Sequence, residues 1–277
     1  MNIMPIHSKV GAIVLLIAIG LLSSVTFTWP ARTVHWHDFS FTLSGSTLLG
    51  LVLFGVACAG TDFIVRGQTA VQPHPQENAS YHPTVCHPAL HWVLPAGWTT
   101  ACWALLARPA PLEKQIAYVA IASGVLALLI FTEYYTVNAV TRWRLLARFA
   151  VQLSAYFVVA LVYLAVHERI PAARIAADTV AAVSAFLFLR LLGEERCSFS
   201  EVLLSALGVG SFLGLLSWLL YPRIASPVMY SFLLVVGLYV LTGLAQQFLQ
   251  GKLRRETLLE YGLVGVVALL LLFLYAR

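Results

Sequence analysis

The chain has 277 residues, of which 60% are hydrophobic and only 10% are charged, and its mean hydropathy is +0.85. Soluble domains carry about 25% charged residues, so this composition excludes a soluble globular protein and indicates that lipid surrounds most of the chain. The net charge of +5 does not indicate a nucleic-acid partner, because the basic residues stand singly or in small groups between apolar stretches, where they set membrane topology.

Nine apolar stretches follow one another along the chain, and most have the length of about 20 residues that a helix needs to cross a bilayer. The sequence therefore predicts an all-α protein, a polytopic bundle of nine transmembrane helices that forms a single integral membrane domain over residues 1–277. The predicted helices are Val10–Trp29, Leu43–Val65, His91–Ala107, Gln115–Asn138, Trp143–Val166, Ile175–Leu192, Val202–Tyr221, Pro227–Leu249 and Leu258–Tyr275.

The third stretch, His91–Ala107, is the weakest of these predictions. Pro95 and Gly97 interrupt it, and both of its ends are polar. If this segment is a broken or re-entrant helix, eight true crossings remain.

Two of the connecting loops are long. Residues 30–46 contain "TVHWHDFSFTL", which alternates as a strand does, and we expect a small hairpin here or a segment that lies along the membrane interface. The other long loop, residues 67–90, is rich in histidine and proline.

The basic residues predict the orientation. With nine crossings, more of them fall on the side of the N-terminus, including the clusters "TRWRLLAR" and "KLRR". The positive-inside rule then places the N-terminus in the cytoplasm and the C-terminus outside, in the inner (cytoplasmic) membrane of a bacterium. In this orientation the loop 30–46 lies outside and the loop 67–90 lies in the cytoplasm.

The histidine-rich loop raises the question of a metal site. Zinc and copper need three or four converging donor atoms, and His82, Cys86, His87 and His91 are the candidate ligands, with His87 and His91 on one face if a helix begins there. The four prolines of residues 73–88 extend the backbone and oppose a compact cage. We favour an irregular interfacial link and keep the metal site as the alternative.

Ionisable residues gather near the predicted cytoplasmic ends of the helices. Such residues are costly within hydrocarbon, so their placement is informative. They either form a polar cavity, with Glu133 as the most deeply placed acid, or pair with one another to fix helix packing, as Asp62 and Arg66 at a spacing of four could. Few polar residues are predicted to lie in the middle of the membrane, namely Gln152, Ser154, Tyr156, Trp218 and Tyr239. The candidate ligand-binding residues are Asp62, Arg66, Glu133, Tyr134, Asn138, Arg148 and Gln246.

Four stretches together resemble an uncharacterised family of bacterial polytopic membrane proteins that is known only as a domain of unknown function. The stretches are "ACAGTDFIVRG", "HWVLPAGW", "FTEYYTVN" and "LYVLTGLAQQFLQGKL". This resemblance implies a helical inner-membrane protein of eight or nine crossings, and it implies no activity.

Three functions remain open. No hydrolase, nucleotide-binding or prenyl-diphosphate signature occurs in the sequence, which favours a non-catalytic accessory or assembly subunit with membrane lipids, other membrane proteins or copies of itself as partners. The first alternative is a carrier or binding protein for a lipid or small hydrophobic molecule. The second is a metal-dependent membrane enzyme, and the sequence does not identify any cofactor.

Overall fold

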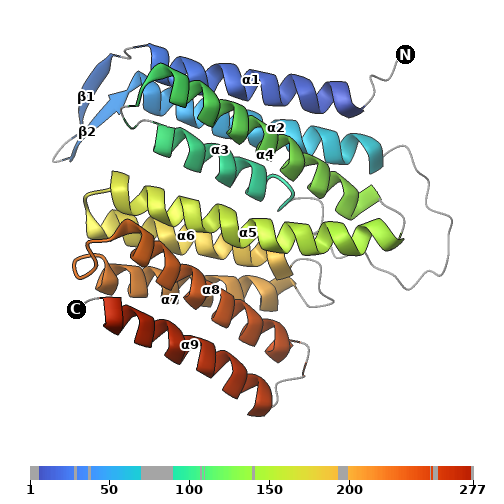
Figure 1. Ribbon diagram of the computed structural model, residues 1–277, viewed down its shortest axis with the longest axis vertical. Coiled ribbons are helices and arrows are strands. Elements are labelled where there is room, and N and C mark those ends of the chain that lie inside the picture. Colours follow the sequence, from blue (N-terminus) through green and yellow to red (C-terminus); the bar gives the residue numbers. More distant parts are fainter. Residues whose placement is uncertain are drawn as a thin grey trace. The chain divides into compact units, whose positions relative to one another are not determined.

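The structure is a computed structural model, and it describes residues 6–27, 30–36, 39–69, 90–106, 108, 110–138, 141–192, 199–249, 251 and 255–275 (Figure 1). The chain divides into two compact units. Unit 1 contains the described residues up to Thr69 and those from His91 to Val151. Unit 2 contains Leu90 and the described residues from Gln152 onward, so the boundary falls within a helix.

A helix forms at each of the predicted stretches. The helices in the described part of the chain are α1 (Ile6–Thr26), α2 (Gly45–Thr69), α3 (Val93–Leu106), α4 (Leu112–Asn138), α5 (Thr141–Arg169), α6 (Ala173–Leu192), α7 (Phe199–Leu220), α8 (Pro227–Leu249) and α9 (Arg255–Tyr275).

Seven of these helices are long and apolar enough to cross a membrane. The two others are α3, which has 14 residues, and α9, whose apolar part is Leu258–Ala268. The third predicted stretch is thus the short one, but Pro95 and Gly97 do not interrupt it: α3 is continuous through both residues. Pro95 is the third residue of α3, in the first turn, where its missing N–H costs no helical hydrogen bond. The prediction of a helical chain is confirmed for the described residues, apart from one hairpin.

The hairpin lies between α1 and α2 (Figure 1) and belongs to unit 1. Strands β1 (Ala31–Trp36) and β2 (Phe39–Ser44) pair antiparallel, with Ala31 opposite Ser44. Of the two alternatives for residues 30–46, the small hairpin is therefore the one that forms. Ser44 then starts α2, because its side-chain oxygen accepts a hydrogen bond from the Thr47 backbone N–H at 3.1 Å.

In unit 1, helices α1, α2, α3 and α4 pack against one another (Figure 1). Leu53 and Ile64 from α2, Leu94 from α3, and Leu126 and Ile130 from α4 are buried. The Trp98 indole N–H of α3 donates a hydrogen bond to the Ala122 carbonyl of α4 at 2.8 Å.

In unit 2, the closest pair of helices is α6 and α7. A Cβ atom at Gly210 of α7 would lie 2.6 Å from the Ala181 carbonyl oxygen of α6, and one at Gly214 would lie 2.8 Å from the Ala181 Cβ. Small residues at this spacing let two helix backbones approach closely. Gly210 belongs to the small-residue run "SALGVGSF", and it is the glycine of this run that contacts α6.

Buried hydroxyl groups connect α5 to α6 and α8 to α5. The Tyr163 hydroxyl of α5 bonds the Ser184 hydroxyl of α6 at 2.6 Å, and the Ser231 hydroxyl of α8 donates to the Ala160 carbonyl of α5 at 2.5 Å. Ser226 precedes α8 and accepts a hydrogen bond from the Met229 N–H at 3.4 Å, while Pro227 takes the first helical position.

Candidate functional site

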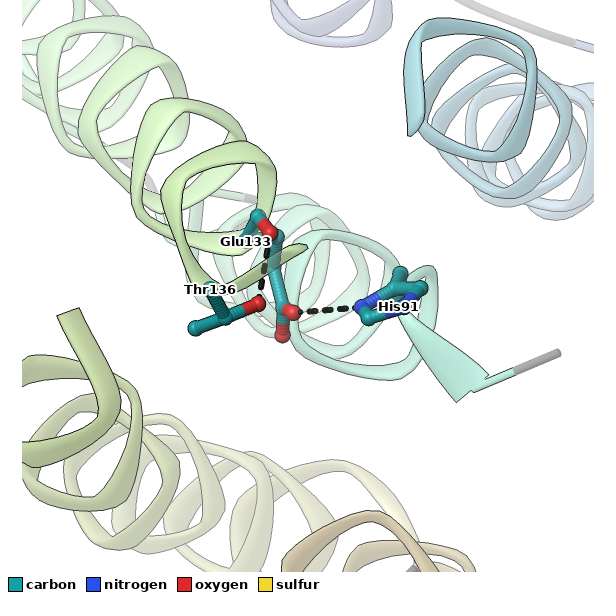
Figure 2. Close-up of polar contacts among 3 residues, drawn as sticks. All are labelled: His91, Glu133 and Thr136. Carbon is teal, nitrogen blue, oxygen red and sulfur yellow. Dashed lines mark hydrogen bonds and ion pairs between the residues drawn. The ribbon is translucent and has the colours of Figure 1, made fainter. Parts of the chain in front are cut away.

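The most deeply buried ionisable groups of unit 1 are His91 and Glu133, and they contact each other. The His91 Nδ1 lies 2.9 Å from the Glu133 Oε2, and the two side chains are 1% and 0% exposed. Figure 2 shows the Glu133 carboxyl group reaching from α4 to the imidazole ring at the start of α3. The Thr136 hydroxyl, also drawn there, donates to the Glu133 backbone carbonyl at 2.7 Å.

The position of this pair follows from the antiparallel packing of α3 and α4. Trp98 meets Ala122 across 24 positions of sequence, and His91 meets Glu133 across 42. Residues with lower numbers on α3 therefore contact residues with higher numbers on α4. This arrangement brings the polar start of α3 to the last turns of α4.

The start of α3 also contacts α2. Trp92, which follows His91, packs edge-on against Phe54 of α2 with the ring centroids 6.1 Å apart. The residue that follows His91 therefore packs against a third helix, while His91 and Glu133 themselves are buried.

The chemistry of the pair fits an enclosed site. Imidazolium with carboxylate and imidazole with carboxylic acid both keep the hydrogen bond, and both give zero net charge. An isolated charge in such surroundings would be costly, whereas a hydrogen-bonded partner removes most of this cost. The pair can therefore hold α3 against α4 without exposure to water.

The pair joins residues that the sequence analysis assigned to different sites. His91 was a predicted metal ligand, and Glu133 was a predicted ligand-binding acid. The other predicted metal ligands, His82, Cys86 and His87, lie outside the described residues. Within the described ranges, no group of at least three His, Cys, Asp or Glu side chains is placed to hold a metal ion.

The remaining predicted ligand-binding residues are spread over both units. In unit 1, the Arg66 Nε donates to the Asp62 Oδ1 at 2.7 Å, so these two residues pair along one face of α2 as their spacing suggested. Tyr134 is half-buried and Arg148 is exposed, and the side chain of Asn138 is outside the described part. Gln246 is half-buried on α8, in unit 2.

A groove of about 370 Å³ opens between α4 and the start of α5, and two of its lining residues are close to Glu133 in the sequence. Its lining is mostly apolar, with Thr132, Tyr135, Leu146, Ala147 and Ala150. The groove belongs to unit 1, and its walls do not include Glu133, which is enclosed on the side of α3.

Unit 2 carries a second polar feature, here called the tyrosine surface: Gln152 and Tyr156 of α5, Tyr239 of α8 and Tyr261 of α9. The ring centroids of Tyr156 and Tyr239 are 5.7 Å apart, as are those of Tyr239 and Tyr261. Gln152 is exposed and Tyr239 is 42% exposed. The sequence marked three of these residues as mid-membrane polar groups, but it did not show that α5, α8 and α9 bring them together.

The fold and these features define a multi-pass α-helical membrane protein. A family model matches residues 30–275, and its description is "Protein of unknown function (DUF5656)". The chain belongs to this family, which confirms the resemblance to an uncharacterised domain family. No curated protein and no solved structure matches the chain.

Proposed function

We propose that this chain is a non-catalytic accessory or assembly subunit, and that it binds another membrane protein through the tyrosine surface of unit 2. The observation that supports this proposal is the exposure of hydrogen-bonding side chains within apolar spans. Gln152 lies in the span Leu145–Arg169, and Tyr239 lies near the middle of the span Pro227–Leu249.

Lipid tails offer no hydrogen-bond partner to an amide or a phenol. Polar side chains within transmembrane segments are therefore found mostly against other helices, where they form interhelical hydrogen bonds. The Gln152 side chain already bonds Tyr156, and a partner helix with its own polar side chain would provide hydrogen bonds for the remaining donor and acceptor positions of Gln152 and for the hydroxyl of Tyr239. The aromatic rings would add a large rigid contact area, as they do in many protein interfaces.

The environment of Glu133 is consistent with a role that does not involve substrate. A general acid or a carrier group must meet its ligand, whereas this carboxyl group is enclosed and bonded to His91. We assign the pair to helix packing, which leaves contacts at the surface of the protein as the means of action.

The proposed location is the inner (cytoplasmic) membrane of a bacterium. The N-terminus lies in the cytoplasm and, with nine crossings, the C-terminus lies outside. This orientation is supported by the distribution of Lys and Arg between the loops.

The test is photo-crosslinking in native membranes, followed by purification in mild detergent. A photoreactive amino acid at position 239 should form an adduct with one membrane protein, and Gln152→Leu should abolish that adduct. The matched control is position 118 on α4, since Tyr118 is also exposed, at 55%, but belongs to unit 1. If position 239 yields no adduct and repeated purifications recover this chain alone, the proposal is wrong.

The groove of unit 1 favours a second candidate function, a carrier or binding protein for a lipid or small hydrophobic molecule. Its volume of about 370 Å³ lies within the range of small-molecule sites, about 300–1,000 Å³. A larger side chain at Ala147, which is buried on its wall, should then reduce binding of a hydrophobic probe such as a brominated fatty acid. Equal binding by Ala147→Phe and the unaltered chain would eliminate this candidate.

A further inference from the structure

A second groove, in unit 2, combines opposite charges with an aromatic ring. It lies between α6 and α7 and has a volume of about 580 Å³. Arg174 and Asp178 line it from the first turns of α6, and Trp218 lines it from the last turn of α7. Further along the helices the lining is small or apolar, with Ala177, Ala181, Gly214 and Leu215, together with Ser211.

The charged end of the groove lies at the ends of two apolar spans. Arg174 is the second residue of the span Ala173–Leu192, and Trp218 is close to the end of the span Ser200–Leu220. These are the positions where membrane helices meet the headgroup layer, in which Trp and Arg are enriched. Ala181 is seven positions beyond Arg174 and therefore lies about 10 Å deeper at 1.5 Å per residue.

Both charges face the groove from exposed positions on one side of α6. Arg174 and Asp178 are four residues apart, and both are exposed. Within the described part of the chain, they form no ion pair with each other. A ligand that carries a positive and a negative group can therefore be bound by both side chains.

The floor of the groove is shaped by the close approach of the two helices. Gly214 leaves so little space that an added Cβ would lie 3.0 Å from the Ala177 carbonyl oxygen. Because no large side chain projects from this seam, an extended acyl chain can lie along it beside Leu215.

From this geometry we infer that the groove between α6 and α7 binds a zwitterionic phospholipid with a primary ammonium headgroup. Arg174 binds the phosphate, since a guanidinium can donate two parallel hydrogen bonds to its oxygens. Asp178 accepts hydrogen bonds from the ammonium group, and the Trp218 ring adds a cation–π contact. One acyl chain follows the seam of Ala181 and Gly214 toward the membrane centre.

The experiment is native mass spectrometry of the full chain in detergent, titrated with phosphatidylethanolamine or phosphatidylglycerol of identical acyl chains. Both lipids carry a phosphate, but only the first carries an ammonium group. The chain should prefer phosphatidylethanolamine, and Asp178→Asn should reduce this preference by about fivefold, the effect expected for a partly exposed ion pair. Asp178→Glu should restore it, and Arg174→Gln should weaken the binding of both lipids.

The matched control is the pair Asp62 and Arg66 on α2, which has the same charges and spacing but is not part of this groove. Asp62→Asn should leave the lipid preference unchanged. Equal affinity of the unaltered chain for the two lipids would overturn the inference. So would an effect of Asp62→Asn as large as that of Asp178→Asn, or competition by soluble glycerophosphoethanolamine at the concentration of the lipid.

Discussion

His91 and Glu133 stand 42 positions apart in the sequence, and in the structure their side chains are joined at 2.9 Å within a site that is closed to solvent. The two residues lie at the start of α3 and near the end of α4, respectively, so their contact fixes one end of an antiparallel helix pair. The Trp98–Ala122 hydrogen bond fixes the same pair of helices at a second level. Together these contacts determine how far α3 extends along α4.

We expect His91→Ala to destabilise the protein strongly. The substitution leaves a carboxyl group buried without its partner, and breaking one side of a buried pair costs about 3–5 kcal/mol. The thermal unfolding midpoint of the purified protein in detergent, followed by size-exclusion fluorescence, should therefore fall clearly.

A double variant distinguishes the contribution of the His91–Glu133 interaction to stability from the contributions of the two side chains taken singly. His91→Leu with Glu133→Leu removes both polar groups, and such replacements of buried pairs are often neutral or stabilising. The double variant should therefore be more stable than either single variant. Additive losses would show that the two side chains stabilise the protein independently.

The seam between α6 and α7 gives a second prediction. Gly210→Ala places a Cβ 2.6 Å from the Ala181 carbonyl oxygen and 2.9 Å from the Ala185 Cβ, so the helices must separate. We expect a loss of roughly 1–3 kcal/mol, as for other overpacked sites, measured as a lower unfolding midpoint. Gly208→Ala on the same helix is the control, because nothing lies within 4 Å of its added Cβ. There Ala should stabilise α7 slightly through its higher helix propensity, and equal losses at both positions would contradict the packing argument.

Local patterns in the sequence predicted most of the helices and one of the contacts. Apolar length alone is enough to place a membrane helix, which is why α8 begins and ends at the predicted residues, Pro227 and Leu249. The Asp62–Arg66 pair also followed from sequence, because a spacing of four places two side chains on one face of any helix.

Contacts between helices were not predictable in the same way. Most residues on every side of these helices are apolar, so hydropathy does not indicate which side meets a neighbour. The sequence therefore assigned His91 and Glu133 to separate sites, and it noted Tyr156 and Tyr239 without placing their rings side by side. Such contacts depend on side-chain shape and on small residues such as Gly210. A single sequence does not show which of these residues meet one another across two helices.

The metal hypothesis for His82, Cys86, His87 and His91 has a direct test. We expect elemental analysis of the purified protein to find less than one equivalent of zinc, copper or iron per chain. One equivalent that disappears in both His82→Ala and Cys86→Ala would contradict this expectation and favour the metal-dependent enzyme. The control for general loss of folding is Ala substitution of His7. This histidine lies outside the loop 67–90 and packs against Phe131.

The number of crossings depends on α3, which at 14 residues is about 21 Å long, against about 30 Å of hydrocarbon. The contacts along α4 nevertheless favour a crossing. His91 meets Glu133, three residues before the end of the span Leu112–Thr136, and α3 ends at Leu106, close in sequence to the start of that span. The segment from His91 to Leu106 therefore runs antiparallel to α4.

We accordingly expect reporters at the two chain ends to lie on opposite sides of the membrane. A fluorescent protein fused to the N-terminus should fluoresce, because it lies in the cytoplasm. Alkaline phosphatase fused to the C-terminus should show enzyme activity, because it lies outside. Alkaline phosphatase inserted at Ala110, between α3 and α4, tests α3 itself and should also be active outside, whereas an insertion in the loop 67–90 should be inactive. An inactive insertion at Ala110 would mean that α3 enters and leaves the membrane on one side. The C-terminus would then lie in the cytoplasm with the N-terminus, which would also reverse the leaflet that the groove between α6 and α7 faces.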